Sequence, residues 1–248
     1  MPEPDLFTHD GLRLLLSTAL DQGYSFESFP RARTAIGRVC ILRHDVDLDL
    51  GAATRVAEIE RDLGISATFF LMLRSPLYNL LSRENHRLAS SLLDLGHEIG
   101  LHYDGAFAPD DSVEMEHWIA TERDILQRMF GRSIDVVSFH QPGLDVLEGA
   151  PTLAGMINAY SLRDSFFYIS DSNMVFRSGS PLTFFQEKAG DHLQLLLHPI
   201  WWDSDTPGRS TMDMFDHAIS ENWLRAQRQL IATEGAFGPE RILEITRP

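Results

Sequence analysis

Short apolar runs alternate with amphipathic segments along most of the chain. The apolar runs are rich in β-branched and aromatic residues, which predicts strands, and we place these at 39–42, 65–73, 97–103, 134–140, 163–172 and 193–198. Between them, apolar residues three or four positions apart predict helices, which we place at 9–22, 50–63, 84–95, 111–130 and 212–233. A shorter helix at 151–160 and a closing strand at 241–246 complete the pattern. Repeated alternation of strand and helix is typical of an α/β fold with a parallel sheet.

The length of the chain bounds its domain organisation. With 248 residues, 44% of them hydrophobic, it fits one large domain with an ordinary packed core. Closure of the sheet into a TIM-like (β/α) barrel with outer helices is the simplest architecture for this many strand–helix units. We therefore predict a single domain over 1–248, with the N-terminal helix over 8–22 as a flanking element against one end or side of the barrel.

The charge balance limits the partners. Lys and Arg number 21 and Asp and Glu number 36, which gives a net charge of −15 and argues against nucleic acids and anionic membrane surfaces. The first residues carry neither the basic region nor the apolar stretch that a signal peptide needs. The single cysteine, Cys40, allows no intramolecular disulfide, which is compatible with a reducing compartment. We expect a soluble, cytoplasmic protein.

Ionisable residues follow the first predicted strand abruptly. The apolar run at 39–42 gives way to Arg43, His44, Asp45 and Asp47. Asp45 and Asp47 are two positions apart, so their side chains leave an extended backbone on the same side. Two carboxylates at close range repel each other unless a cation or a shared proton relieves them. The segment therefore predicts a metal or catalytic site, or else a solvated acidic loop. Arg43 and His44 are candidates for supporting such a site or contacting its substrate, or they only pair with acidic neighbours.

Three histidines stand at or just past the ends of other predicted strands. They are His102, His140 and His198. In a parallel barrel, the carboxyl ends of different strands meet at one mouth. We therefore expect these histidines to converge there with Asp45 and Asp47.

Five segments, in this order along the chain, resemble the motifs of one enzyme family. They are 43–47 (Arg-His-Asp-Val-Asp), 67–70 (Ala-Thr-Phe-Phe), 96–102 (Gly-His-Glu-Ile-Gly-Leu-His), 138–142 (Ser-Phe-His-Gln-Pro) and 195–198 (Leu-Leu-Leu-His). Together they resemble the polysaccharide deacetylase (NodB-homology, carbohydrate esterase) family of metal-dependent amide and ester hydrolases. The resemblance is strongest to the cytoplasmic branch found in bacterial surface-polysaccharide (O-antigen) biosynthesis, and it implies a distorted barrel.

The resemblance also implies roles for individual residues. It makes Asp45 the base, Asp47 and His102 ligands of a divalent metal ion, and His198 the general acid. The metal would polarise an acyl carbonyl and lower the pKa of a bound water. Asp45 would take the proton of that water, and His198 would protonate the leaving amine.

Two positions depart from the family pattern. A second ligand histidine usually stands four residues after the first, where this chain has Ala106, and an arginine usually stands near the base, where it has His140. His140 could therefore supply the third ligand, giving with Asp47 and His102 a set that suits zinc with one open position. Asp104 is the other candidate ligand, and loss of the metal site is a third alternative. Zinc fits this set best, and cobalt, nickel, manganese or iron also fit it.

Residues around the predicted site carry weaker signals. Asp171 could orient His140 or His198, or it could be a turn residue that binds its own backbone. Trp201 and Trp202 follow the predicted strand at 193–198 and could form an aromatic wall for a sugar ring, or they belong to the core.

Three functions are compatible with these residues. The first is a hydrolase that removes an acyl group, in the first place acetyl, from an N-acylated sugar or saccharide precursor. The absence of a histidine at Ala106 motivates the second, a non-catalytic carbohydrate-binding protein on the same barrel. The third is a metal hydrolase that acts on a non-sugar C–N bond, such as that of a cyclic amide.

Overall fold

A single sheet organises the computed structural model, which describes residues 6–107 and 112–236. Its strands lie in the order β6-β7-β5-β4-β3-β2-β9-β8, with β1 also paired to β2. In chain order the strands are β1 (Tyr24–Phe26), β2 (Arg38–Val46), β3 (Thr68–Leu71), β4 (Glu98–Asp104), β5 (Val136–His140), β6 (Thr152–Leu153), β7 (Met156–Asn158), β8 (Phe167–Ser170) and β9 (His192–Leu197).

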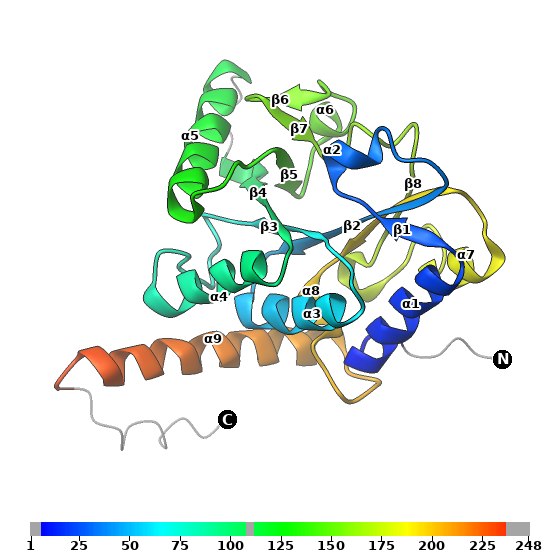
Figure 1. Cartoon of the computed structure of the whole chain (residues 1–248). Coiled ribbons are helices and arrows are strands. Elements are labelled where there is room, and N and C mark those ends of the chain that lie inside the picture. The colour runs from blue at the N-terminus through cyan, green and yellow to red at the C-terminus, as the bar shows by residue number, and fades with distance from the viewer. Residues whose placement is uncertain (1–5, 108–111, 237–248) are drawn as a thin grey trace.

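The sheet is almost entirely parallel and is curled into a half-barrel (Figure 1). Only the short pair β6–β7 is antiparallel. The predicted α/β architecture with parallel strands and outer helices is confirmed. The barrel is distorted because it does not close: among the described residues, no strand pairing joins the edge strands β8 and β6.

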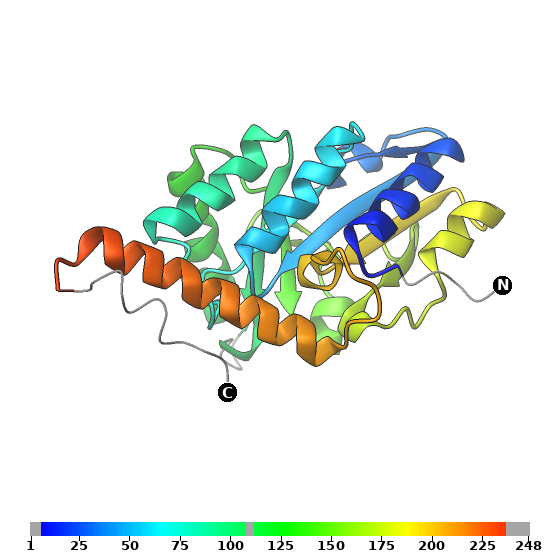
Figure 2. The same cartoon turned by 90° about the horizontal axis from the view of Figure 1, so that it is seen from below.

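Helices α1, α3, α4 and α5 lie along one side of this curled sheet (Figure 1). The long helix α9 crosses the outer surface beside α3 and α4, which is clearest from below (Figure 2). The α-helices are α1 (His9–Asp21), α2 (Phe29–Ala32), α3 (Leu50–Asp62), α4 (Arg83–Asp94), α5 (Ser112–Phe130), α6 (Leu144–Leu147), α7 (Pro181–Glu187), α8 (Pro199–Trp202) and α9 (Thr211–Thr233); the 3₁₀ turns are η1 (Gly105–Phe107) and η2 (Ser172–Met174).

The N-terminal helix α1 begins and ends where its sequence predicts. The Thr8 hydroxyl accepts a hydrogen bond from the Gly11 backbone N–H at 3.0 Å, which satisfies one of the free donors of the first turn. Gly23, with a φ of 81°, follows the end of the helix. The helix packs against α3, α7 and α8, so it flanks the sheet on its outer side.

Alternate residues of the central strand β2 enter two different cores. Cys40 and Leu42 belong to a large core between the sheet and the helices, whereas Val39 and Ile41 belong to a smaller core inside the curl. Because side chains alternate along a strand, the inner row continues with Asp45 towards the carboxyl end. Two apolar layers therefore hold the strand that presents the acidic residues.

The helix predicted at 151–160 is wrong. This segment forms β6 and β7, in which Leu153 pairs with Met156. Ala154 and Gly155 turn the chain between them with φ angles of 48° and 78°, a left-handed conformation that breaks a helix. The pairing of β7 with β5 then outweighs the helical spacing of the apolar residues. The strand predicted at 241–246 lies outside the described residues.

Two further features are the hydropathy of the helices and the state of the single cysteine. Within 6–107 and 112–236, no helix is both long enough and apolar enough to cross a bilayer. Cys40 is a free, buried thiol, and burial raises its pKa well above the ordinary value. The unreactive protonated form of this thiol is therefore favoured.

Candidate metal centre

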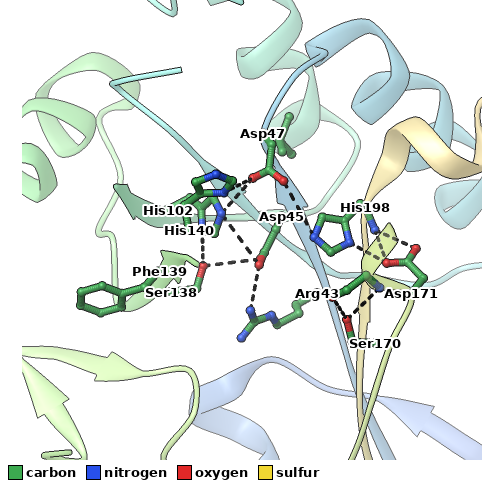
Figure 3. A network of polar contacts seen from close by, with 12 residues as sticks. Arg43, Asp45, Asp47, His102, Ser138, Phe139, His140, Ser170, Asp171 and His198 are labelled. Atoms are coloured by element: carbon green, nitrogen blue, oxygen red, sulfur yellow. Dashed lines mark hydrogen bonds and ion pairs between the residues drawn. The ribbon is translucent and has the colours of Figure 1, made fainter. Parts of the chain in front are cut away.

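The predicted site residues of four strands meet at one cavity of about 560 Å³ (Figure 3). Asp45 and Asp47 come from the end of β2, His102 from β4 and His140 from the end of β5, and His198 follows β9. All five line the cavity. The parallel register explains the convergence, since β2 and its neighbours end at the same edge of the sheet.

Asp47, His102 and His140 form the candidate metal site. Asp47 Oδ1 lies 2.9 Å from His102 Nε2 and 3.4 Å from His140 Nδ1, and one ligand atom from each residue falls within 4.8 Å of the others. Asp47 Oδ1 is buried but meets neither nitrogen with hydrogen-bond geometry. One carboxylate oxygen and two imidazole nitrogens in this arrangement fit a divalent transition metal with a position left open.

The charges around Asp47 keep its carboxylate ionised. Burial acts to raise its pKa, but the close imidazoles of His102 and His140 and the charge of His198 outweigh burial and lower the pKa well below the ordinary value. A carboxylate that is already ionised needs to release no proton when it binds a cation.

His102 is oriented by a serine on the neighbouring strand. Its Nδ1 lies 2.6 Å from the Ser138 hydroxyl, and that hydroxyl lies 3.5 Å from Asp45 Oδ1. The chain Nδ1–H to Ser138 to Asp45 leaves Nε2 of His102 free to bind a metal ion. Such a partner fixes the tautomer and ring orientation of a ligand histidine.

Asp45 is held by a buried arginine from its own strand. Arg43 Nη2 donates a hydrogen bond to Asp45 Oδ2 at 2.9 Å, and the guanidinium lies over the rings of Phe70 and Tyr160 at 5.2 and 4.9 Å. Asp45 Oδ2 is 3.9 Å from His102 Nε2. The carboxylate therefore faces the candidate metal site, with its other contacts fixed from below (Figure 3).

His198 stands on the other side of Asp47, against Asp171. Its Nδ1 lies 2.6 Å from Asp171 Oδ1, and its Nε2 lies 3.8 Å from Asp47 Oδ2. Asp171 also accepts hydrogen bonds from the His198 backbone N–H at 3.0 Å and from Trp202 Nε1 at 2.8 Å. Asp171 thus lies against His198 rather than His140, and it turns Nε2 of His198 towards the cavity.

The carboxylates around His198 favour its charged form. Burial lowers its pKa, but Asp171, with its charge and hydrogen bond, and the charge of Asp47 raise the pKa to about 9. The imidazolium is therefore the form present at neutral pH, and it can donate a proton from Nε2.

The alternative ligand Asp104 does not join the cluster. Its Oδ1 accepts the backbone N–H of Ala106 at 3.1 Å, and the group of three potential ligands found among the described residues contains His140 instead. The position that usually carries a ligand histidine is occupied by Ala106, an exposed residue of the turn η1. A histidine on the neighbouring strand occupies the third corner.

Two predicted residues lie away from the cavity. His44 points to the outer side of β2, where its Nε2 lies 2.6 Å from Glu60 Oε1 on α3, because it alternates with Arg43 and Asp45 along the strand and shares the side of Leu42 that faces the helices. The placement of His44 beside the site is therefore wrong. Trp202 is fully buried, so its Nε1 supports Asp171 and it forms no aromatic wall. Trp201 lines the cavity in its place.

The cavity contains polar residues that sequence reasoning missed. Tyr160 lines its floor, and its hydroxyl lies 3.4 Å from Arg43 Nη2. Arg163 lines both this cavity and a neighbouring hollow of about 480 Å³. Gln141 and Asn173, also in the wall, have φ angles of 51° and 57°, a conformation that non-glycine residues adopt mainly where surrounding structure imposes it. Of these four residues, only Gln141 lies in one of the motif-like segments of the sequence, 138–142.

Comparison with known proteins gives similarities of structure only. No family model and no curated protein matches the chain. The match with peptidoglycan deacetylase PdaC from Bacillus subtilis covers 82% of this chain and 98% of the PdaC chain, at 15% identity and a TM-score of 0.42. The match with the Streptococcus pyogenes deacetylase PplD, in complex with acetate, covers 84% of this chain and 85% of the PplD chain, at 14% identity and a TM-score of 0.44.

A CE4 family pseudoenzyme from Bacillus anthracis is similar to the same degree. It covers 77% of this chain at 16% identity and a TM-score of 0.44, and the chain spans 64% of its length. With TM-scores below 0.5, these similarities to two deacetylases and a pseudoenzyme carry no conclusion about activity.

Proposed function

We propose that this protein is a metal-dependent hydrolase that removes an acyl group, in the first place acetyl, from an N-acylated sugar or saccharide precursor. One observation carries the proposal. The three candidate ligands Asp47, His102 and His140 meet at one cavity with a carboxylate, Asp45, on one side and an imidazole, His198, on the other. Hydrolysis of an amide needs these parts: a site for an electrophilic ion, a proton acceptor and a proton donor.

A divalent ion held by Asp47, His102 and His140 would polarise the acyl carbonyl and lower the pKa of a water molecule beside it. Asp45 is placed to accept the proton of that water, because its Oδ2 faces His102 Nε2 at 3.9 Å. Arg43 donates to this same oxygen and Ser138 to Oδ1, so both oxygens of the carboxylate are held in place. The base is thus fixed before the substrate arrives.

His198 is placed to protonate the leaving amine. An amide breaks slowly unless its nitrogen is protonated as the bond cleaves, since an amine anion is a very poor leaving group. Nε2 of His198 faces the cavity, while Asp171 holds Nδ1. The raised pKa of about 9 keeps the acid charged at neutral pH, and a positioned acid of this kind contributes about 10²- to 10⁴-fold in rate.

The shape of the cavity supports a saccharide as substrate. Its volume of about 560 Å³ lies in the range of small-ligand sites, and it adjoins the second hollow past Tyr160 and Arg163. Trp201 and Phe215, whose rings meet edge to face at 5.1 Å, add apolar wall. We further propose zinc as the ion, the cytoplasm as the location and a bacterial surface-polysaccharide (O-antigen) precursor as the substrate, on the strength of the ordered sequence motifs.

Acetate release tests the proposal. The purified chain would be stripped with a chelator, reloaded with zinc or cobalt, and incubated with N-acetylglucosamine and its oligomers. Metal-dependent release of acetate is the expected result. Saccharide binding without metal uptake or acetate release would instead favour the non-catalytic carbohydrate binder. Ring opening of cyclic amides, without acetate release from saccharides, would favour the non-sugar C–N hydrolase.

A further inference from the structure

Arg163 brings a permanent positive charge to the cavity. It is the only lysine or arginine among the described residues that line the cavity wall. Histidines line it too, but an imidazole can lose its proton near neutral pH, whereas a guanidinium stays charged. In a chain with a net charge of −15, a fixed positive charge at the cavity is an exception that calls for a reason.

No acidic residue of the described chain neutralises Arg163. Arginines elsewhere are held by carboxylates, as Arg55 is by both oxygens of Asp203 at 2.5 and 2.6 Å. Within the part of the chain that the structure describes, no carboxylate lies within ion-pair distance of the Arg163 guanidinium. An exposed arginine is ordinarily hydrated, but this one is hydrated beside a candidate substrate site, so its charge is available to a ligand there.

The backbone and an aromatic ring hold Arg163 in position. Its N–H donates to the Tyr160 carbonyl at 3.3 Å, and the Phe166 N–H donates to the Leu162 carbonyl at 2.8 Å, which closes a tight turn. Tyr160, Leu162 and Phe166 are buried and anchor that turn. The guanidinium lies over the Tyr168 ring at 5.5 Å, and Tyr168 also lines the cavity. Stacking of this kind restricts a guanidinium while its N–H groups remain free to donate hydrogen bonds.

Arg163 stands where the cavity adjoins the outer hollow of about 480 Å³, and it lines both. A ligand that extends from the candidate metal centre into the outer hollow therefore passes beside its guanidinium. Glu148 and Asp164 line the outer hollow but not the cavity. These carboxylates repel an anion and can accept hydrogen bonds from sugar hydroxyls. The charges thus favour an anionic group beside Arg163 on the cavity side and a neutral, hydroxylated group farther out.

We infer that the N-acylated sugar substrate carries an anionic group, a carboxylate or a phosphate, which Arg163 binds. The inference rests on the proposed hydrolase function and adds the chemical class of the substrate. A guanidinium matches both groups with two parallel N–H donors. Arg163 is then the residue that distinguishes acidic from neutral N-acylated sugars.

Kinetics on matched sugars test this specificity. The zinc-loaded chain would be assayed with neutral N-acetylglucosamine, with its 1-phosphate and 6-phosphate, and with N-acetylglucosaminuronic acid, which has a carboxylate at carbon 6. At least one anionic sugar is expected to exceed the neutral one in kcat/KM by about 10- to 100-fold, as hydrogen bonds to a charged group allow. Preference for the uronic acid would assign a carboxylate, and preference for a sugar phosphate would assign a phosphate.

Arg163→Gln should remove this preference, and Arg163→Lys should retain part of it, because lysine keeps the charge without the paired donors. Arg132→Gln is the matched control. Arg132 is exposed and lines a separate hollow, so its loss changes the net charge equally and should leave the preference as it is. An equal fall of kcat/KM for neutral and anionic sugars in Arg163→Gln would show a role in the shape of the cavity only, and would overturn the inference.

Calorimetric binding of the same sugars separates this inference from the hydrolase proposal. Tighter binding of an anionic sugar than of N-acetylglucosamine, lost in Arg163→Gln, would uphold the anion site even if none of the sugars were hydrolysed, a result that would count against the hydrolase. Hydrolysis of all four sugars with equal kcat/KM would support the hydrolase and overturn the anion site. Equal binding of neutral and anionic sugars without hydrolysis would count against both.

Discussion

The two sides of β2 carry the same kinds of residue into different surroundings. On the inner side, Asp47 follows the strand and meets His102 at 2.9 Å. On the outer side, His44 meets Glu60 at 2.6 Å. Each side thus has a histidine–carboxylate contact, and the sequence alone does not separate them.

What separates the two sides is access and the number of converging groups. His44 and Glu60 are both fully covered, with His44 stacked on Phe69 at 4.4 Å, so no substrate can reach them. The inner contact borders the cavity and has His140 as a third potential ligand, and no other such group occurs among the described residues. A buried pair of this kind supports the fold, whereas an accessible group of three can do chemistry.

The largest expected effect comes from Asp47→Asn. It removes the carboxylate that both candidate ligand histidines face, so metal binding and acetate release should both fall below detection. Metal content by mass spectrometry and a turnover assay on N-acetylglucosamine oligomers measure this.

Glu60→Gln is the matched change on the outer side. It should keep metal content and turnover while lowering the free energy of unfolding by about 1–3 kcal/mol, since the His44 hydrogen bond loses its charged acceptor. Equal loss of metal in both variants would erase the distinction between the two sides, and retained turnover in Asp47→Asn would remove the proposed mechanism.

Replacing the proposed acid should separate chemistry from metal binding. His198→Asn is expected to lower kcat by about 10²- to 10⁴-fold, with zinc content close to that of the wild type, because His198 stands outside the group of three ligands. His44→Asn, the corresponding histidine change on the outer side, should leave kcat nearly unchanged. A His198→Asn enzyme with normal kcat would assign the proton donor to another group.

A smaller effect is expected at the serine that orients His102. Ser138→Ala removes the partner of His102 Nδ1, which should weaken zinc affinity by about 10- to 100-fold without abolishing turnover at saturating zinc. Competition titration with a chromogenic chelator measures the affinity. An unchanged affinity would mean that packing alone holds the ring of His102.

The convergence on the inner side could be predicted from the sequence because it depends on a simple rule. The strand-then-polar pattern placed Asp45, Asp47, His102, His140 and His198 at strand ends, and parallel strands bring such ends together. The spacing of two between the aspartates put them on one side of β2. The same alternation puts the residue between Arg43 and Asp45 on the other side, which is the physical reason that His44 lies away from the cavity.

Other features depend on contacts that sequence spacing does not encode. The segment at 151–160 has helical spacing, but a left-handed turn at Ala154 and pairing with β5 make it a hairpin. Tyr160 reaches Arg43 across 117 positions of sequence. Ser138 lies in a recognisable motif, but its role becomes visible only when β4 and β5 are paired in register.

The inner and outer histidines should also respond to pH in opposite ways. In metal-free protein, the carboxylates around His198 raise its pKa to about 9, above the unfolded value of about 6.5. The protonated side chain therefore adds stability that is fully present below pH 6.5 and is lost as the pH rises through about 9. The difference in free energy of unfolding between the wild type and His198→Asn should shrink from pH 6.5 to pH 10 by about 3 kcal/mol. A constant difference would contradict the raised pKa.

The smallest effect is the opposite one, at His97 on the outer side. Burial lowers the pKa of His97 against the opposing charge of Glu60, and its Nε2 lies 2.9 Å from the Ala57 carbonyl. A histidine whose pKa is lower in the folded state binds its proton more weakly there, so stability falls as the pH drops below about 6.5. In His97→Gln this loss of stability at acid pH should be smaller by a few tenths of a kcal/mol. Chemical denaturation at pH 5 and pH 7 would measure the difference. His97→Gln could instead change stability on the alkaline side, as expected for a group like His198. In that case, the histidines on the inner and outer sides of the sheet would not have pKa values shifted in opposite directions.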